Sequence, residues 1–383
     1  MIKSWADRIE TRVLQTMETP GLFAPFSFDQ VLAGFSTVYK ALVTLRYAMY
    51  GAGVLKTRHL GCPVISIGNL AVGGSGKTPM AVWLGKMLVE KGLRPVVISR
   101  GYRGTLDAGA AVVSDGRDIF LDSKTCGDEP YMMAMERAFP VVVGKDRYRA
   151  GLMALEDFAP DVVILDDAFQ HLKLGRDLNL VLVDCNQPLG NGRMLPAGRL
   201  RETLGMAKDR IDGIVFTRCP MDILQGSGRP SQVKEIMETL PSVPAFFCRH
   251  EPFVAQLFPA RGSKTEHIQS GCLTGRTAVL FSGLARNAAF AQSVQDLDVN
   301  IAAHLEFCDH YRYNEPDFDR ILARAKALNV DLILTTRKDW VKANPACFRD
   351  VTVAVIDVRL RFRDPGRLEK FVLGNTFGQA AAS

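Results

Sequence analysis

The sequence predicts an α/β protein with a doubly wound, mostly parallel sheet, a second and smaller α/β unit, and an N-terminal amphipathic helical arm. Short aliphatic runs alternate with helix-like segments over residues 61–218, as expected of buried parallel strands joined by crossover helices. The same alternation returns over residues 277–339, and residues 22–60 are rich in aromatic and aliphatic side chains. The expected divisions are the arm at 1–60, a first α/β domain at 61–270 and a smaller C-terminal α/β domain at 271–383.

Length, composition and charge restrict the possible partners. The chain has 383 residues, of which 47% are hydrophobic and 23% are charged, so two globular domains with sizeable cores are expected. The net charge of +6 suits anionic ligands or an anionic membrane surface, and no basic tract with interleaved aromatics indicates nucleic acid. The eight cysteines are scattered without metal-ligand spacing, which favours buried thiols in a reducing compartment. Nothing in the composition implies an obligate protein partner.

The arm is expected to contain one long helix over residues 28–50. Such a helix would be apolar over more than half of its circumference, with Lys40 and Arg46 placed to reach anionic head groups. No window reaches the ~20 apolar residues that a spanning helix needs. A helix on the membrane surface and a helix buried against its own domain fit this pattern equally well.

The segment from 63 to 80, PVISIGNLAVGGSGKTPM, has the order of strand, glycine-rich turn and helix that a phosphate-binding loop requires. Its glycines permit backbone angles that let successive N–H groups surround phosphate oxygens. Lys77 would reach the β- and γ-phosphates of ATP, and the Thr78 hydroxyl would ligate Mg²⁺. Alanine at position 71 replaces the first glycine of the strict motif, and a chance glycine turn is the less favoured alternative. The sequence therefore predicts a P-loop NTPase-like domain whose nucleotide-binding residues are Ala71, Val72, Gly73, Gly74, Ser75, Gly76, Lys77 and Thr78.

A basic turn and a long loop offer sites for an anionic substrate. The predicted strand over 94–99 runs into Arg100, Tyr102 and Arg103, and ligands of open α/β sheets bind beyond the carboxyl ends of strands. A solvated basic turn is the alternative. The Gly/Pro-rich segment 186–202 has no secondary-structure period, and such loops inside compact domains are usually functional, although an ordinary surface crossover also fits.

Carboxylates follow two other segments of the first domain. Asp166 and Asp167 end an aliphatic run, which is the form of a Walker-B segment whose aspartate faces Mg²⁺ directly or through water. Asp128 stands where a helix begins. N-terminal capping explains Asp128 as well as a carboxylate aimed at the nucleotide does.

The C-terminal part repeats the α/β alternation. Residues 277–294 indicate strand, glycine turn and helix, and the next strand would deliver His310 to its carboxyl end. A helix over 315–328 and a strand over 331–339 follow. The last strand ends in a turn that loosely matches base-recognition turns, and packing between domains is its favoured role. Its polar residues are Thr335, Thr336, Lys338 and Asp339.

Together, the glycine loop, GDEP at 127–130, LDDAFQH at 165–171, NGRMLPAGRLRE and DHYRY at 309–313 resemble one family, the tetraacyldisaccharide 4'-kinases, which are the lipid A 4'-kinases of Gram-negative bacteria. The resemblance covers residues 60–340. It implies transfer of the γ-phosphate of ATP, with Mg²⁺, to the 4'-hydroxyl of a tetraacyl glucosamine disaccharide 1-phosphate, giving lipid IVA in lipid A biosynthesis. It also implies a peripheral or monotopic place at the cytoplasmic face of the inner membrane, which gives the apolar arm a role.

The same resemblance assigns roles to individual residues. Asp128 matches the aspartate that accepts the proton of the 4'-hydroxyl, and His310 matches the histidine that supports it. Which of these two is the base stays open at this point. Lys77 is the third residue expected in catalysis. The remaining matches are Asp166 and Asp167 beside the metal, and Arg201 and Glu202 in the active-site loop.

Two other functions fit the same loop and sheet. A kinase or synthetase of a soluble small molecule would need no arm. A nucleotide-dependent switch or metallochaperone-like protein would favour cysteine clusters, which are absent from the sequence, and would give Asp128 and His310 no role. Deletion of residues 1–60 would distinguish them, because only the lipid kinase needs the arm for membrane recovery.

Overall fold

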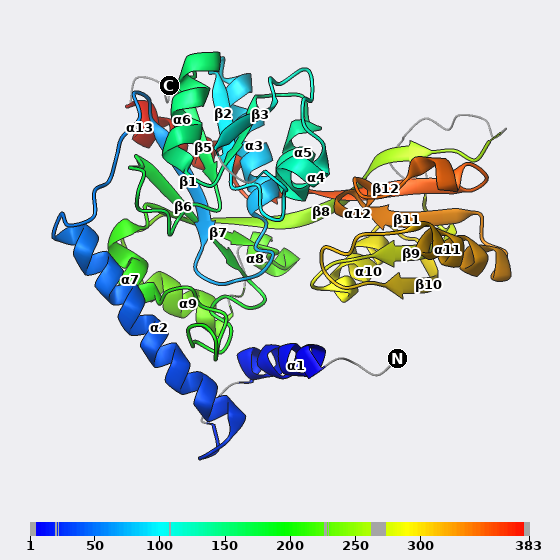
Figure 1. The fold of residues 1–383 in the computed structure, drawn as a ribbon, viewed down its shortest axis with the longest axis horizontal. Helices are drawn as coiled ribbons and strands as arrows, with labels where there is room; N and C mark the ends of the chain where they lie inside the picture. The colour runs from blue at the N-terminus through cyan, green and yellow to red at the C-terminus, as the bar shows by residue number, and fades with distance from the viewer. Residues whose placement is uncertain are drawn as a thin grey trace.

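The computed structural model describes residues 5–19, 21, 23–106, 109–225, 228, 230–261 and 273–378. Two lobes are joined by a ribbon of two long strands (Figure 1). The strands of the first lobe are β1 (Val64–Asn69), β2 (Pro95–Ser99), β3 (Ala110–Ser114), β4 (Val141–Gly144), β5 (Val162–Asp166), β6 (Leu178–Asp184) and β7 (Gly213–Thr217). The remaining strands are β8 (Ala245–Phe258), β9 (Thr277–Ser282), β10 (Asn300–Glu306), β11 (Leu332–Thr336) and β12 (Thr352–Phe362).

These strands form one twelve-stranded sheet in the order β10-β9-β11-β12-β8-β7-β6-β1-β5-β2-β4-β3. Neighbouring strands are parallel except at the β3–β4 edge and along the β8–β12 ribbon. The predicted doubly wound, mostly parallel α/β fold is therefore confirmed. Every residue of β1, β2, β4, β5 and β7 is buried, which explains why these strands appear in the sequence as unbroken aliphatic runs.

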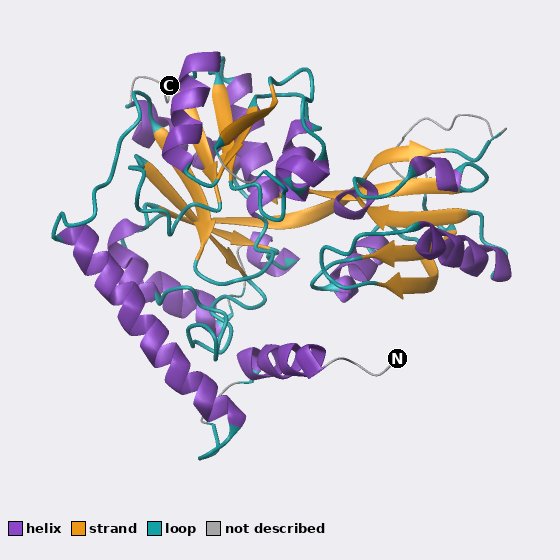
Figure 2. Cartoon of the chain, viewed as in Figure 1, coloured by secondary structure: helices purple, strands orange, loops and turns teal. Residues whose placement is uncertain are grey.

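Helices cover both faces of the sheet in each lobe (Figure 2). In the first lobe, α3 and α13 pack on one face through Leu84 and Val372, and α6 packs on the other through Ala154. In the second lobe, α11 and α10 take opposite faces, with Ile321 and Val294 in separate cores. The bounds are α3 (Lys77–Glu90), α4 (Ser123–Cys126), α5 (Asp128–Ala134), α6 (Arg147–Phe158), α7 (Leu204–Ala207), α8 (Met221–Gln225), α9 (Ser231–Thr239), α10 (Asn287–Gln295), α11 (Glu315–Ala327), α12 (Arg337–Trp340) and α13 (Pro365–Phe377), with short 3₁₀ turns at Lys208–Arg210 and Pro345–Phe348.

The chain crosses between the lobes along the β8–β12 ribbon. The expected domain boundary at 270/271 lies outside the described residues. β8 pairs with β7 at its start and with β12 from Cys248 to Phe258, so this strand belongs to both lobes. After β12 the chain returns, and α13 adds Leu368 and Val372 to the core of the first lobe. The division at 270/271 stays a prediction, and the final helix packs with the first lobe.

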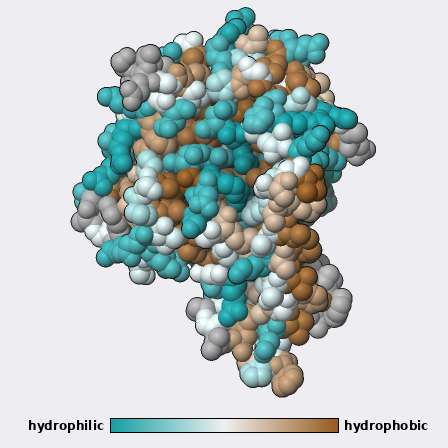
Figure 3. All heavy atoms as spheres, turned by 90° about the vertical axis from the view of Figure 1, so that its left-hand side faces the viewer, coloured by the Kyte–Doolittle hydropathy of each residue, from teal (hydrophilic) through white to brown (hydrophobic). Residues whose placement is uncertain are grey.

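The arm consists of α1 (Trp5–Glu18) and α2 (Phe28–Gly51), and the latter is the helix expected over 28–50. One face of α2 packs on the first lobe, where the Ser36 hydroxyl donates to the carbonyl oxygen of Met194 at 2.7 Å. The other face is apolar and exposed, and it appears as a ridge with many hydrophobic atoms in Figure 3. Within the described ranges, no helix is both long enough and apolar enough to cross a membrane. The exposed residues of this stripe, spaced three and four apart, are Phe28, Val31, Phe35, Val38, Leu42 and Leu45.

Candidate active site

The glycine loop joins β1 to α3 in a conformation that its sequence requires. Gly73 and Gly76 have φ angles of 124° and 87°, which side chains other than glycine rarely adopt. A Cβ at Gly76 would lie only 2.6 Å from Nε2 of His250, so space is restricted as well. Burial, with the charge of Arg218 nearby, lowers the pKa of His250 to about 3, so this ring is neutral beneath the loop. The predicted loop over 71–78 is thus held in one shape by its surroundings.

The two aspartates after β5 lie beside the lysine of this loop. Nζ of Lys77 is 3.6 Å from Oδ1 of Asp167, and Arg201 donates to both oxygens of Asp167 at 2.8 and 3.2 Å. Burial favours the protonated form of Asp167, but Lys77 and Arg201 together hold its pKa below the usual range. Asp166 is fully buried and accepts a hydrogen bond from Ser99 at 3.1 Å. Its burial, followed by the charges of Glu129 and Asp167, raises the pKa of Asp166 to about 7.

The oxygen atoms around this lysine fit a magnesium ion. Oδ1 of Asp166 is enclosed and has no hydrogen-bond partner in the described structure. Thr78 lies in the first turn of α3, and Asp167 adds a second carboxylate. Among the described residues, no three His, Cys, Asp or Glu side chains gather into a metal site of their own. Mg²⁺ commonly binds one or two carboxylates together with substrate phosphates. The carboxylates of Asp166 and Asp167 are ligands of this kind, and the Thr78 hydroxyl adds an oxygen donor.

A carboxylate and a histidine meet across the two lobes. Asp128 begins α5 in the first lobe, and His310 follows β10 in the second. Nδ1 of His310 lies 3.1 Å from Oδ2 of Asp128, while Nε2 lies 3.2 Å from Nζ of Lys338. Because an ammonium group only donates, Nε2 accepts and Nδ1 carries the proton that is donated to Asp128. Lys338 also pairs with Asp309 at 2.8 Å, so it fixes the orientation of the ring.

Lys338 and Arg147 are site residues that sequence reasoning missed. The sequence favours a role in interdomain packing for the turn that contains Lys338, and the structure places Nζ of this lysine 3.2 Å from Nε2 of His310. Arg147 is buried next to the paired aspartates, and its burial, with Arg100 nearby, lowers its pKa. The available signal for Arg147 was a basic residue at the start of the helix that follows a buried strand.

The basic turn after β2 reaches the lobe boundary. The ring of Tyr102 lies 6.0 Å from the ring of His310, and Nη1 of Arg103 donates to the carbonyl oxygen of Asp309 at 3.4 Å. Arg100 lies near enough to Arg147 for its charge to add to the effect of burial in lowering the pKa of Arg147. Tyr102 and Arg103 therefore border the Asp128–His310 pair, whereas Arg100 lies near Arg147.

Arg201 and Glu202 have different surroundings. Arg201 reaches Asp167, as described above. Glu202 is fully buried and accepts hydrogen bonds from Tyr47 and Gln170, each at 2.8 Å, and from Arg210. Through Tyr47 it connects α2 to the loop, and burial followed by the charge of Glu202 raises the pKa of that tyrosine. The structure thus brings Arg201 into the site and places Glu202 in a polar network beneath it.

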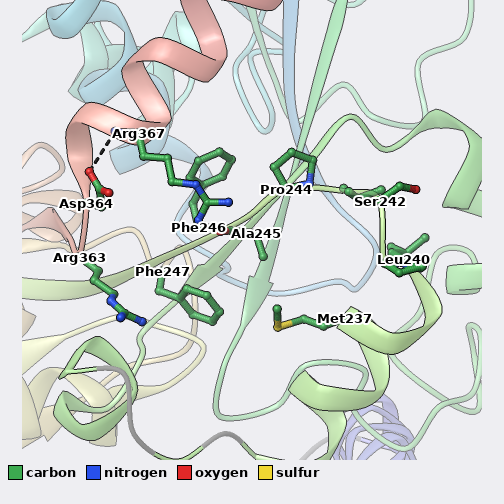
Figure 4. A pocket seen from close by; sticks show the side chains of 12 residues that line it. Met237, Leu240, Ser242, Pro244, Ala245, Phe246, Phe247, Arg363, Asp364 and Arg367 are labelled. Carbon is green, nitrogen blue, oxygen red and sulfur yellow. Dashed lines mark hydrogen bonds between the residues drawn. The ribbon is translucent and has the colours of Figure 1, made fainter.

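One hollow of about 520 Å³ lies far from these residues (Figure 4). It is formed by α9, the beginning of β8 and the beginning of α13, with Phe246 and Arg367 in its wall. The beginning of β8 marks the amino-terminal edge of the parallel sheet, whereas the glycine loop lies at the carboxyl edge. None of the predicted site residues lines this hollow.

Comparisons with known proteins identify the family of this chain. Residues 28–376 match the family described as tetraacyldisaccharide-1-P 4'-kinase. The tetraacyldisaccharide 4'-kinase of Geobacter metallireducens is 41% identical over 342 residues, which cover 88% of this chain and 96% of the relative. That of Geobacter sulfurreducens is 40% identical over 340 residues, covering 88% and 91%. A crystal structure of LpxK from Aquifex aeolicus in complex with ATP has a TM-score of 0.70 and 30% identity, covering 92% of this chain and all of that one. The chain therefore belongs to the tetraacyldisaccharide 4'-kinase family.

Proposed function

We propose that this protein transfers the γ-phosphate of ATP to the 4'-hydroxyl of a tetraacyl glucosamine disaccharide 1-phosphate, giving lipid IVA in lipid A biosynthesis. The observation that carries the proposal is the Asp128–His310 pair, which lies across the lobe boundary at 3.1 Å. The phosphate loop, the paired aspartates and the family membership support a kinase. A nucleotide switch would have no use for a carboxylate and histidine held together in this way.

The phosphate loop binds and orients the triphosphate. Backbone N–H groups of residues 73–78 surround the β- and γ-phosphates, and Nζ of Lys77 neutralises their charge. Thr78, Asp166 and Asp167 would hold Mg²⁺, which supplies further neutralisation of the phosphate charge when it is bound. Because phosphoryl transfer depends mainly on positioning and charge stabilisation, these groups account for the nucleotide half of the site.

Asp128 is the group that we assign to the acceptor. Its Oδ2 accepts the N–H of His310, and its other oxygen accepts the proton of the 4'-hydroxyl. The hydroxyl oxygen then bonds to the γ-phosphorus as the bond to the bridging oxygen of ADP breaks. A positioned base of this kind contributes roughly 10²–10⁴-fold in rate. His310 donates its Nδ1–H to Asp128, which orients the carboxylate and stabilises its charge until it accepts the hydroxyl proton.

The lipid is expected to approach from the side of the arm. Arg100, Tyr102 and Arg103 would contact the sugar and its 1-phosphate, and Arg201 would stabilise the carboxylates near the nucleotide. The exposed stripe of α2 would lie on the cytoplasmic surface of the inner membrane, where the acyl chains of the substrate are held. Its exposed neighbour Lys40 would meet anionic head groups.

The test is transfer of labelled γ-phosphate from ATP to detergent-dispersed tetraacyl disaccharide 1-phosphate. The wild-type chain should label the lipid, and Asp128→Asn should reduce kcat by about 10²-fold or more while leaving nucleotide binding intact. Hydrolysis of ATP without labelled lipid would instead favour a switch or a kinase of a soluble substrate. Full turnover by Asp128→Asn would remove Asp128 from the role of base.

A further inference from the structure

Arg199 lies against the phosphate loop on a segment that is paired with it. Val72 donates its backbone N–H to the carbonyl oxygen of Arg199 at 2.8 Å, and Arg201 donates to that of Leu70 at 2.7 Å. Ala71 and Leu200 face each other across this short antiparallel bridge. The loop over 186–202 is therefore held in register with the phosphate loop rather than crossing over it freely.

The side chain of Arg199 projects to the same side of this segment as that of Arg201. Alternate residues of an extended segment share a side, and Leu200 between them points into the core. Arg201 reaches Asp167 beside Lys77. Arg199 accordingly has its Nη1 only 3.6 Å from the position that a Cβ on Gly73 would take.

The guanidinium of Arg199 is sheltered and only partly engaged. Its side chain is 16% exposed, and its Nε is enclosed without a hydrogen-bond partner in the described structure. Nη2 pairs with Oε1 of Glu18 at 2.5 Å. Glu18 is the last residue of α1, which the loop holds through a hydrogen bond from Asn191 to the carbonyl oxygen of Thr16 at 3.1 Å.

We propose that Arg199 is an arginine finger supplied by the chain itself, which contacts the γ-phosphate during transfer and is held by Glu18 while no nucleotide is bound. This inference rests on the proposed kinase activity. Charge on the γ-phosphoryl oxygens and on the bridging oxygen of ADP needs a donor beyond Lys77, and a guanidinium beside the loop supplies it. In the resting state the Glu18 carboxylate accepts a hydrogen bond from the guanidinium. During transfer, oxygen atoms of the γ-phosphate would take its place as acceptors.

Glu18 is suited to being displaced. Its side chain is 57% exposed, and ion pairs with an exposed partner are weak. A phosphate group carries more charge than a carboxylate and accepts two parallel bonds from the same fork. Glu18 lies in α1, outside residues 28–376 that match the family model. Glu18 in the resting enzyme and the γ-phosphate in the transition state thus bind the same arginine in turn.

Steady-state kinetics of lipid labelling test the proposal with three variants of the full chain. Arg199→Ala should lower kcat by about 10²-fold or more and change the KM for ATP less than about threefold, because the contact forms mainly in the transition state. Arg199→Lys should recover only a small part, since lysine lacks the planar fork. Glu18→Gln should raise kcat/KM for ATP about twofold to fivefold. Arg94→Ala, which breaks the 2.8 Å ion pair with Asp161 at the opposite edge of the sheet, is the control and should match wild type.

Calorimetric binding of ADP with aluminium fluoride and Mg²⁺ separates this inference from the proposed function. Wild type should bind this transition-state mimic more tightly than ADP, and Arg199→Ala should lose that gain while keeping its affinity for ADP. Lack of lipid labelling by wild type would overturn the proposed function, and the calorimetry would still decide the role of Arg199. Equal affinity of wild type and Arg199→Ala for the mimic, or a normal kcat in this variant, would overturn the inference.

Discussion

Gly76 is the residue where the phosphate loop is most restricted. Its φ of 87° is unfavourable for any side chain, and a Cβ would meet the ring nitrogen of His250 at 2.6 Å. The ring belongs to β8, so the ribbon that joins the lobes also supports the nucleotide site from below. A glycine in a phosphate loop is usually explained by the close approach of the phosphate to the backbone. Here the His250 ring, packed against the loop, also leaves no room for a side chain at position 76.

We expect Gly76→Ala to lower the free energy of unfolding by about 2–4 kcal/mol and to raise the KM for ATP, because strain and a close contact act together. Urea denaturation at pH 7 measures the first effect. Gly92→Ala is the matched control, since Gly92 has a φ of 78° and open space around its missing Cβ. This control should cost only about 1 kcal/mol, the cost of the backbone angle alone. Equal losses in the two variants would show that the contact with His250 contributes nothing.

The sequence predicted site residues that belong to local motifs. It missed site residues whose contacts depend on the tertiary fold. Lys77 and the paired aspartates could be found because a strand, a glycine turn and a helix have local signatures. Lys338 had no such mark, since its contact with His310 depends on how a turn of the second lobe is placed. Glu202 matched an active-site motif, and its burial against Tyr47 depends on the position of α2, which no local pattern reveals.

At the level of elements, α2 combines two surfaces that the sequence pattern could not separate. One contacts the first lobe through Ser36 and Tyr47, and the other is the exposed apolar stripe. The alternative of a helix packed against its own domain is confirmed for one face, and the membrane-surface alternative stays a prediction for the other. Deletion of residues 1–60 is consequently a poor test of membrane binding, because it would also remove the partner of the buried Glu202.

Two substitutions on the stripe give a sharper test. Phe35→Glu with Leu42→Glu should reduce binding to vesicles with anionic lipid at least about tenfold, because each change replaces a side chain that inserts apolar area with a charge. Cosedimentation measures binding, and circular dichroism checks that folding is kept. Thr37→Glu adds a charge at an exposed position off the stripe and should have a small effect. A double variant that binds vesicles like wild type would exclude the stripe as the membrane contact.

The ribbon strands show why boundaries of elements are hard to predict. Charged residues begin at Arg249, directly after an aromatic run that is typical of a strand, yet β8 continues to Phe258. Glu251 in the continuation pairs with Arg359 at 2.8 Å and with Arg361 at 3.0 Å on β12. The charges that resemble a loop in the sequence are cross-strand pairs in the structure. Neither β12 nor α13 was anticipated, because their partners lie far away in the chain.

In the whole molecule, one buried arginine connects the lobes. Arg337 on α12 pairs with Glu136 of the first lobe and with Asp357 of the ribbon, the latter at 2.9 Å. Its side chain is 12% exposed. Burial raises the pKa of Asp357, and Arg337 acts against this by stabilising the charged form. The second lobe is therefore attached to the first by a charge cluster as well as by backbone.

Arg337→Ala should lower the free energy of unfolding by about 3 kcal/mol, because it leaves two largely buried carboxylates without their cation. It should also increase the radius of gyration measured by X-ray scattering, since a contact between lobes is lost. Arg361→Ala is the matched control, because this arginine is 64% exposed and should contribute at most about 1 kcal/mol. Unchanged stability and scattering in Arg337→Ala would exclude this cluster as the attachment of the lobes.

The division of the Asp128–His310 pair between lobes has a consequence for how ATP is protected. Asp128 belongs to the first lobe, which carries the phosphate loop, and its partner His310 belongs to the second. An opening of the lobes would separate His310 from Asp128 and leave the proposed base without the group that orients it. A kinase built in this way would activate water near the phosphates poorly with its lobes apart, because the proposed base is complete only where Asp128 and His310 meet.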